Sequence, residues 1–165
     1  MSMNGEYLAV TAAQLDKAIK EPGWALKLAY QVMDAEGEPQ RPPAEARCMT
    51  THKAWHAIAF LLERAGFRDY IVYGDQALTD EDWGYGPPRY LTPERVREAA
   101  DALANLSYND LIAEVAPADL SAAEIYPSIW DDEDALEWVR GWFEDLEPFF
   151  RAAAGRGDAM LTWLD

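Results

Sequence analysis

The stretch DDEDALEWVRGWFEDLEPFFRAAAGRGDAMLTWL, residues 131–164, combines one long amphipathic helix with one apolar strand. Its apolar side chains recur at spacings of three and four residues: Leu136, Val139, Phe143, Leu146, Phe150 and Ala153. This period is typical of a helix with one buried face, and the acidic run 131–134 favours the helix start. We expect this helix to cross the core with a kink near Pro148. Residues 159–164, which follow two glycines, are predicted to form a strand.

The beginning of the chain has the opposite order, a strand and then a helix. Residues 6–10, EYLAV, are short, aromatic and apolar enough for a strand. Thr11 and Gln14 then form a capping box, in which each side chain binds a backbone N–H of the first helical turn. A second helix is predicted to start at Pro22, because proline is favoured in the first turn, and to end before Gly37.

Between these ends, helices and strands do not alternate regularly. The expected elements are a helix capped by Thr50 or Thr51 and stopped by Gly66, a buried strand at 69–73, a helix at 93–105, a helix from Ser107 and a short helical turn between 117 and 130. Residues 37–43 and 74–91 are rich in proline or glycine and are expected to be loops. We therefore predict a single compact α+β domain over residues 1–165, with several helices on a small, mainly antiparallel sheet.

The net charge of −16 is concentrated in the second half of the chain. Residues 1–74 carry nine acids and eight bases, a net charge of −1, whereas residues 75–165 carry twenty-one acids and six arginines, a net charge of −15. Such a surface repels phosphate backbones and attracts basic proteins, so we expect no nucleic-acid binding. Acidic surfaces also serve solubility alone, and that interpretation stays open.

Cysteine usage and the N-terminal sequence favour a reducing compartment. Cys48 is the single cysteine, so neither an intramolecular disulfide nor a Cys₂ or Cys₄ metal site can form. The first residues, MSMNGE, do not have the basic and apolar regions of a secretory signal. No apolar run approaches the roughly 18 residues of a membrane span. We expect a cytoplasmic protein without a membrane partner.

Known catalytic and metal-binding motifs fit this sequence poorly. His52 and His56 are four residues apart, as in zinc-binding HExxH helices, but Lys53 stands where that motif needs its glutamate. No third histidine exists, and the serines do not lie in a G-x-S-x-G setting. We therefore predict no catalytic residue, no metal and no cofactor, and we favour a protein that is not an enzyme.

The candidate binding residues are mainly aromatic groups on the least regular segments, together with a histidine and an arginine. They are His56, Trp83, Tyr85, Arg89, Tyr90, Tyr126 and Trp130. If these side chains converge, they line a cleft for a flat ligand, a sugar or a peptide, and nearby carboxylates favour a cationic group. If they do not converge, they close the hydrophobic core.

The order of several segments resembles the bacterial YfbM-like family, a domain of unknown function. The segments are YLAV (7–10), KAWH (53–56), LLERAG (61–66), PRYLTPE (88–94), IYPSIW (125–130) and AML (159–161). The resemblance covers nearly the whole chain and departs from the family pattern at His52, where the family often has an acidic residue. It implies a compact cytoplasmic α+β domain and supplies no activity, cofactor or catalytic residue.

Two hypotheses of function follow from these observations. The leading one is a non-catalytic recognition protein that presents an acidic, aromatic surface to a basic protein partner, as toxin-neutralising immunity proteins do. It requires the tryptophans of the second half to face outward. The alternative is a small-molecule-binding protein or enzyme in which residues 74–91 close over Tyr126, Trp130 and His56. A purely structural subunit is a third possibility, and it would show a large exposed apolar patch.

Overall fold

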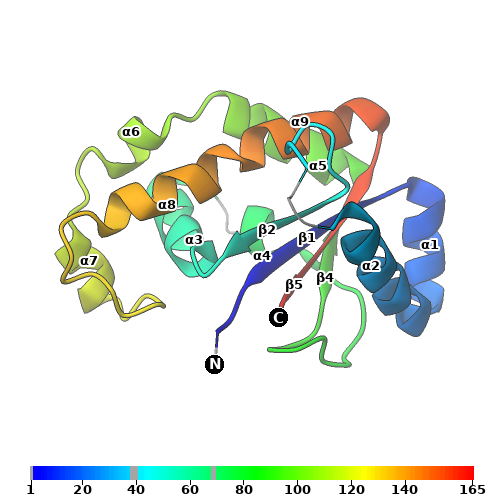
Figure 1. The fold of residues 1–165 in the computed structure, drawn as a ribbon. Helices are drawn as coiled ribbons and strands as arrows, with labels where there is room; N and C mark the ends of the chain where they lie inside the picture. Colours follow the sequence, from blue (N-terminus) through cyan, green and yellow to red (C-terminus); the bar gives the residue numbers. More distant parts are fainter. Residues whose placement is uncertain (1, 38–40, 68–69) are drawn as a thin grey trace.

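A five-stranded antiparallel sheet forms the centre of the protein in a computed structural model that describes residues 2–37, 41–67 and 70–165 (Figure 1). The strands are β1 (Gly5–Val10), β2 (Cys48–His52), β3 (Gln76–Ala77), β4 (Arg89–Leu91) and β5 (Ala159–Leu164). Their order across the sheet is β2-β1-β5-β4-β3. The predicted α+β class with an antiparallel sheet is confirmed.

The two central strands come from opposite ends of the chain. β1 and β5 pair along their whole length, from Gly5 opposite Leu164 to Val10 opposite Ala159. Nearly every residue of both strands is buried, because helices or loops cover both faces of the sheet. This two-sided burial explains why EYLAV and AMLTWL are almost continuously apolar instead of alternating with polar residues.

Helices α1 (Ala12–Lys20) and α2 (Pro22–Glu36) cover the sheet face that carries Leu8, Val10, Leu161 and Trp163 (Figure 1), called the small face here. The predicted capping box starts α1: the backbone N–H of Gln14 donates to Thr11 Oγ1 at 3.1 Å, and the Thr11 N–H donates to Gln14 Oε1 at 2.9 Å. Pro22 is the first residue of α2, as expected.

The opposite sheet face, called the large face, carries Tyr7, Ala9 and Met160 and supports the larger core. Its helices are α3 (Trp55–Arg64), α4 (Tyr70–Tyr73), α5 (Pro93–Ala104), α8 (Ala135–Glu144) and α9 (Leu146–Arg156), with α6 (Tyr108–Ile112) and α7 (Pro117–Ala122) farther from the sheet. The Tyr7 ring lies edge-on to Phe149 and Phe150, at centroid distances of 6.4 and 5.9 Å. These contacts hold α9 on the sheet.

Two predicted elements between β1 and β4 were wrong. The described part of the predicted strand 69–73, Tyr70–Tyr73, is the single helical turn α4, because a short apolar run is compatible with either structure. Thr50 and Thr51 do not cap a helix but belong to β2, which pairs with β1, and α3 begins only at Trp55. Threonine is common both at helix starts and in strands, and here the pairing with β1 decides for the strand.

Two further predictions needed correction, one in the middle of the chain and one near its end. The expected loop at 74–91 contains β3 and β4, which pair with each other and join β5. The expected kinked helix is divided at Asp145 into α8 and α9. Pro148, the third residue of α9, has no N–H to donate to the carbonyl of Glu144, so the helix is interrupted between Glu144 and Leu146. Residues 38–40 of the predicted loop 37–43 lie outside the described residues.

Within the described parts of the chain, each helix is too short or too polar to cross a membrane. The helix starts at Thr92 and Ser107 agree with the sequence: Thr92 Oγ1 accepts from the Arg95 N–H and Ser107 Oγ accepts from the Asp110 N–H. The left-handed conformation of Gly66, with φ of +85°, follows the end of α3 as expected.

Candidate functional site

An open groove of about 610 Å³ lies where the loop before α8 passes the end of β2. Its lining residues are His52, Lys53, Pro127, Ile129, Asp132, Asp134, Ala135, Trp138 and Trp142. Trp138 and Trp142 are four residues apart on α8, so both project from the same side of the helix. Both are only partly buried, and this volume is within the range of ligand pockets in proteins.

His52 joins the end of β2 to α8 at one side of the groove. Its imidazole stacks on the Trp142 indole at a centroid distance of 5.3 Å and an interplanar angle of 13°. The backbone of His52 is left-handed, with φ of +50°, which is uncommon for a residue with a side chain. Its N–H donates to Thr50 Oγ1 at 2.9 Å. This turn ends β2 and directs the imidazole onto α8.

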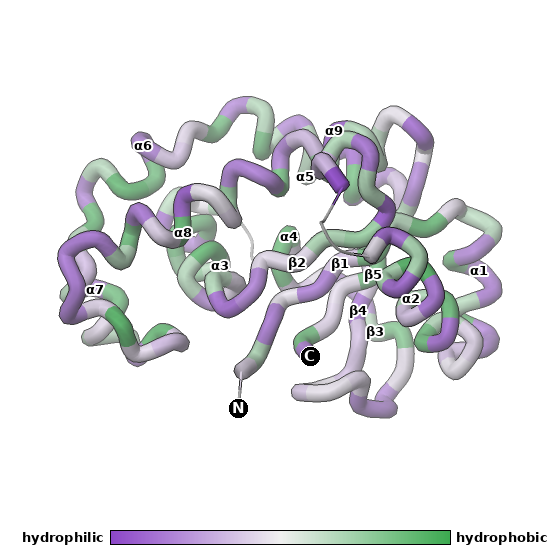
Figure 2. Tube along the Cα trace, in the orientation of Figure 1, coloured by the Kyte–Doolittle hydropathy of each residue, from purple (hydrophilic) through white to green (hydrophobic). Residues whose placement is uncertain are grey.

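The other side of the groove is acidic. Asp132 and Asp134 belong to the exposed run 131–134, which is hydrophilic throughout (Figure 2). Asp132 Oδ1 accepts from the Asp134 N–H at 2.8 Å, and among the described residues neither carboxylate forms a salt bridge. Lys53 supplies the one basic side chain in the groove lining. The groove therefore combines indole surfaces with carboxylates that form no ion pair within the described residues.

Two of the sequence-predicted site residues, His56 and Tyr126, connect α3 to the segment after α7, and a third, Trp130, lies within that segment. His56 Nδ1 accepts from the Tyr126 N–H at 3.0 Å, and burial lowers the pKa of His56, so the imidazole stays a neutral acceptor. The Trp55 ring stacks on both His56 and Tyr126, at 4.9 and 6.0 Å. Trp130 Nε1 donates to the Ile125 carbonyl at 2.7 Å. These contacts fix the segment in place.

The other four, Trp83, Tyr85, Arg89 and Tyr90, lie around β4 and β5. The Trp83 ring lies edge-on to Trp163 at 5.6 Å. The Tyr85 N–H donates to the Leu164 carbonyl at 2.9 Å, and the Tyr90 hydroxyl donates to Gln76 Oε1 at 2.8 Å. This group and the group around His56 thus contact different neighbours, and the structure does not gather all seven residues into one cluster.

The expectation that the tryptophans of the second half face outward was wrong for Trp83, Trp130 and Trp163, which are 4%, 5% and 6% exposed. Trp163 is enclosed in β5, and the other two lie on irregular segments that cover the core, where a large ring fills the space that no helix occupies. Trp138 and Trp142, which were not among the sequence-predicted site residues, line the groove instead. Two tryptophans at i and i+4, which begin four residues after the last of four consecutive acids, were the signal in the sequence for this groove.

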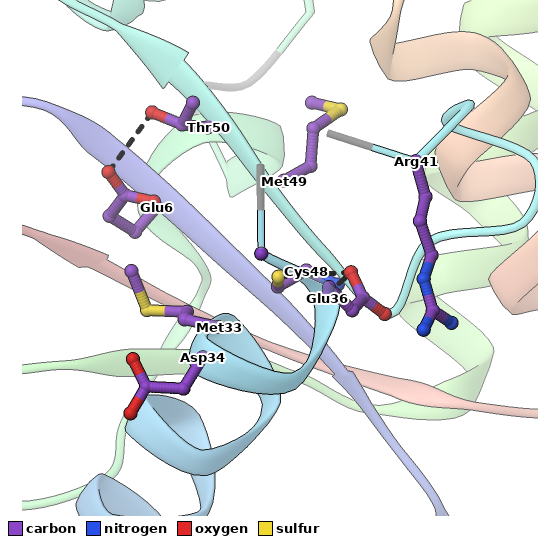
Figure 3. Close-up of a pocket in the computed structure, with 9 residues that line it drawn as sticks. Glu6, Met33, Asp34, Glu36, Arg41, Cys48, Met49 and Thr50 are labelled. Atoms are coloured by element: carbon purple, nitrogen blue, oxygen red, sulfur yellow. Dashed lines mark hydrogen bonds between the residues drawn. The ribbon is translucent and has the colours of Figure 1, made fainter. Parts of the chain in front are cut away.

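A second cavity, of about 470 Å³, lies beside α2 and β2 (Figure 3). Its lining includes Glu6, Met33, Glu36, Cys48 and Thr50. The Glu6 carboxylate accepts from the Thr50 hydroxyl at 3.0 Å. Burial raises the pKa of Glu6 to about 7, against the lowering effect of the Thr50 bond. Glu6 is therefore partly protonated near neutral pH.

The thiol in this cavity is held in its protonated form. Cys48 Sγ donates to Glu36 Oε2 at 3.1 Å, and burial together with Glu36 raises the pKa of Cys48 to about 12. A thiol with this pKa stays protonated at neutral pH, and the thiolate is the reactive form. Among the described residues, no group of three or more His, Cys, Asp or Glu side chains is placed to hold a metal ion.

Helices packed on both faces of an antiparallel sheet, with an acidic aromatic groove at one end, define an α+β protein of unassigned activity. Residues 1–163 match the family described as "Domain of unknown function (DUF1877)", and the chain belongs to this family.

A solved structure supports the same fold. The crystal structure of a protein of unknown function, YfbM from Escherichia coli, matches with a TM-score of 0.70 and 18% sequence identity over 100% of both chains. The resemblance to the YfbM-like family is thereby confirmed, and at this identity the structural match concerns the fold alone. No curated protein matches this sequence.

Proposed function

We propose that this protein is a non-catalytic recognition protein that binds a basic protein partner in the groove beside α8. The observation that carries the proposal is the placement of Trp138 and Trp142 next to the unpaired carboxylates of Asp132 and Asp134. Indole faces bind the apolar stems and the cationic heads of lysine and arginine, and carboxylates complement their charge. Tryptophan is also enriched in protein interfaces.

The charge of the whole chain supports the same class of partner. Residues 75–165, which include most of the groove, carry a net charge of −15. A field of this sign accelerates encounter with basic proteins and disfavours acidic ones. Lys53 stands in the groove lining and repels a cationic side chain. We therefore place the basic groups of the partner on the aspartate side, in a mode like that of immunity proteins with their toxins.

A pull-down with matched variants tests this proposal. The immobilised protein, at low and moderate salt, is compared with the triple variant Asp132→Asn, Asp134→Asn, Trp142→Ala. The control for charge is the double variant Asp80→Asn, Glu81→Gln, because both acids are exposed and lie outside the groove lining. Circular dichroism checks that each variant is folded.

We expect a basic protein to be retained by the wild type and by the control variant, lost by the groove variant, and retained less at moderate salt because salt screens exposed charges. Equal retention by the groove variant would place the interface elsewhere. Failure to retain any specific basic protein at either salt concentration would contradict the function itself.

A further inference from the structure

A smaller cleft, of about 160 Å³, lies where β4 and β5 meet α4. Its lining includes Tyr73, Tyr85, Pro87, Arg89, Thr162 and Leu164. It contains two of the sequence-predicted site residues, Tyr85 and Arg89, and none of the residues that line the groove beside α8. It is too small for a drug-sized ligand and has room for a molecule of a few heavy atoms.

Arg89 brings positive charge into this cleft in a chain whose net charge is −16. Its Nε donates to the Gly74 carbonyl at 3.3 Å, which orients the guanidinium. Arg95, Arg140 and Arg156 each pair with a carboxylate, but Arg89 forms no ion pair within the described parts of the chain. Its two terminal nitrogens are therefore available, and this planar fork matches a carboxylate with two parallel hydrogen bonds.

Thr162 supplies an unused hydroxyl beside Arg89. The two residues are directly opposite each other in the β4–β5 pair, so their side chains share the large face. Thr162 is 2% exposed, and its Oγ1 has no hydrogen-bond partner among the described residues. Buried hydroxyls are normally paired, so an unpaired one that lines a cleft points to a missing acceptor.

Gly74 packs closely against both of these residues. Its backbone is left-handed, with φ of +70°, and a Cβ at this position would lie 2.9 Å from Thr162 Oγ1 and 2.9 Å from Arg89 Cβ. Any other residue would therefore press against both groups. The glycine thus lets the backbone pass beside the Thr162 hydroxyl and accept the hydrogen bond from Arg89 Nε.

We propose that this cleft binds a small monocarboxylate, with the Arg89 guanidinium paired to the carboxylate and the Thr162 hydroxyl as an additional donor. The rings of Tyr73 and Tyr85 then contact the short apolar part of the ligand. The Arg89 guanidinium compensates one negative charge on the ligand. Asp165 disfavours a second negative charge on the ligand, because its Oδ1 lies beside Gly84 next to the cleft. This single compensating charge favours a carboxylate over a phosphate dianion.

Titration followed by ¹H–¹⁵N NMR tests the site directly. The probes are acetate, propionate and butyrate, with the corresponding primary amides and inorganic phosphate as comparisons. The variants are Arg89→Gln, Arg89→Lys and Thr162→Val, and the matched control is Arg97→Gln, which removes the same charge from an exposed position. The spectrum also reports whether each variant is folded. Trp142→Ala serves as a control for the other groove.

We expect saturable shifts at the backbone amides of Tyr85, Arg89 and Thr162 with at least one carboxylate and with none of the amides. Arg89→Gln should weaken binding by about tenfold or more, as loss of a charge-assisted pair does, and Arg89→Lys should recover only part of it. Thr162→Val should weaken binding several-fold. Arg97→Gln and Trp142→Ala should bind as the wild type does.

Absence of saturable shifts with every carboxylate would overturn the proposal, as would unchanged affinity in Arg89→Gln. Phosphate that binds as tightly as the best carboxylate would overturn the assignment to a monocarboxylate. These outcomes are independent of the protein partner, because the pull-down depends on residues that the cleft does not contain.

Discussion

The two faces of the central sheet are covered in different ways. On the large face, helices pack closely and bury an aromatic core around Tyr7, Phe149 and Phe150. On the small face, α1 and α2 cover one part, the loop with Trp83 covers another, and the cavity beside Glu6 stays open. Closely packed helices leave cavities only at the edges of the layer that they form. On the small face, where separate segments cover the sheet, the carboxyl group of Glu6 remains beside a cavity. The candidate sites lie at such margins.

The largest expected effect concerns the loop that covers the small face. Trp83→Ala should lower the free energy of unfolding by about 3–5 kcal/mol, because it removes a buried indole and leaves a cavity against Trp163. Tyr85→Ala, at a side chain that is 38% exposed, should cost about 1 kcal/mol or less. Urea unfolding followed by circular dichroism measures both values. Similar costs for the two variants would show that the loop does not seal this face.

The open cavity of the small face predicts a pH-dependent stability that depends on Glu6. Its pKa in the folded protein, about 7, lies above the value of 4.5 for an unperturbed glutamate. Between these values the unfolded chain has released its proton and the folded protein retains it, so the contribution of Glu6 to stability is lost as pH rises. The loss is roughly 2–3 kcal/mol between about pH 4.5 and pH 7.

The variant Glu6→Gln isolates this contribution from the general repulsion of an acidic chain. It should exceed the wild type in unfolding free energy at pH 8 by more than at pH 5, and urea unfolding at both pH values measures the difference. The control is Glu81→Gln at an exposed position. A constant difference between Glu6→Gln and the wild type at both pH values would show that Glu6 ionises normally.

At the edge of the large face, Trp142 should contribute less to stability than Trp83 does. Trp142→Ala removes a partly buried indole and its stack on His52, so we expect a loss of about 1–2 kcal/mol in unfolding free energy. The same urea experiment measures it. A loss as large as that of Trp83→Ala would mean that Trp142 is a core residue and would weaken its assignment to a binding groove.

The sequence predicted those elements that local rules determine. The capping box at Thr11, the cap at Thr92 and the strands at both ends depend on neighbouring residues and were correct. β2, β3 and β4 were missed because their stability comes from pairing with strands distant in the sequence. Strand propensity is strongly dependent on such context.

The site was predicted less well than the fold for a related reason. Aromatic residues on glycine- and proline-rich segments indicated a surface, but Trp83 and Trp130 cover the core there. The groove at Trp142 depends on the left-handed turn at His52, and the carboxylate cleft depends on strand register between Arg89 and Thr162. Neither register nor a left-handed histidine follows from composition or periodicity.

The smallest expected effect has an unusual sign and concerns a single hydroxyl on the large face. An unpaired buried hydroxyl destabilises the folded state, so Thr162→Val should raise the unfolding free energy by about 1 kcal/mol when no ligand is present. Thr51→Val is the matched control: Thr51 is also fully buried, but its Oγ1 donates to the Gly5 carbonyl at 3.3 Å, so this variant should lose about 1 kcal/mol. Urea unfolding in a buffer free of carboxylates measures both.

If Thr162→Val is instead less stable than the wild type, the hydroxyl is already paired in the free protein, and the cleft loses its second donor. If it is more stable, the chain retains a hydroxyl that weakens its own fold, which is the behaviour expected of a group kept for a ligand.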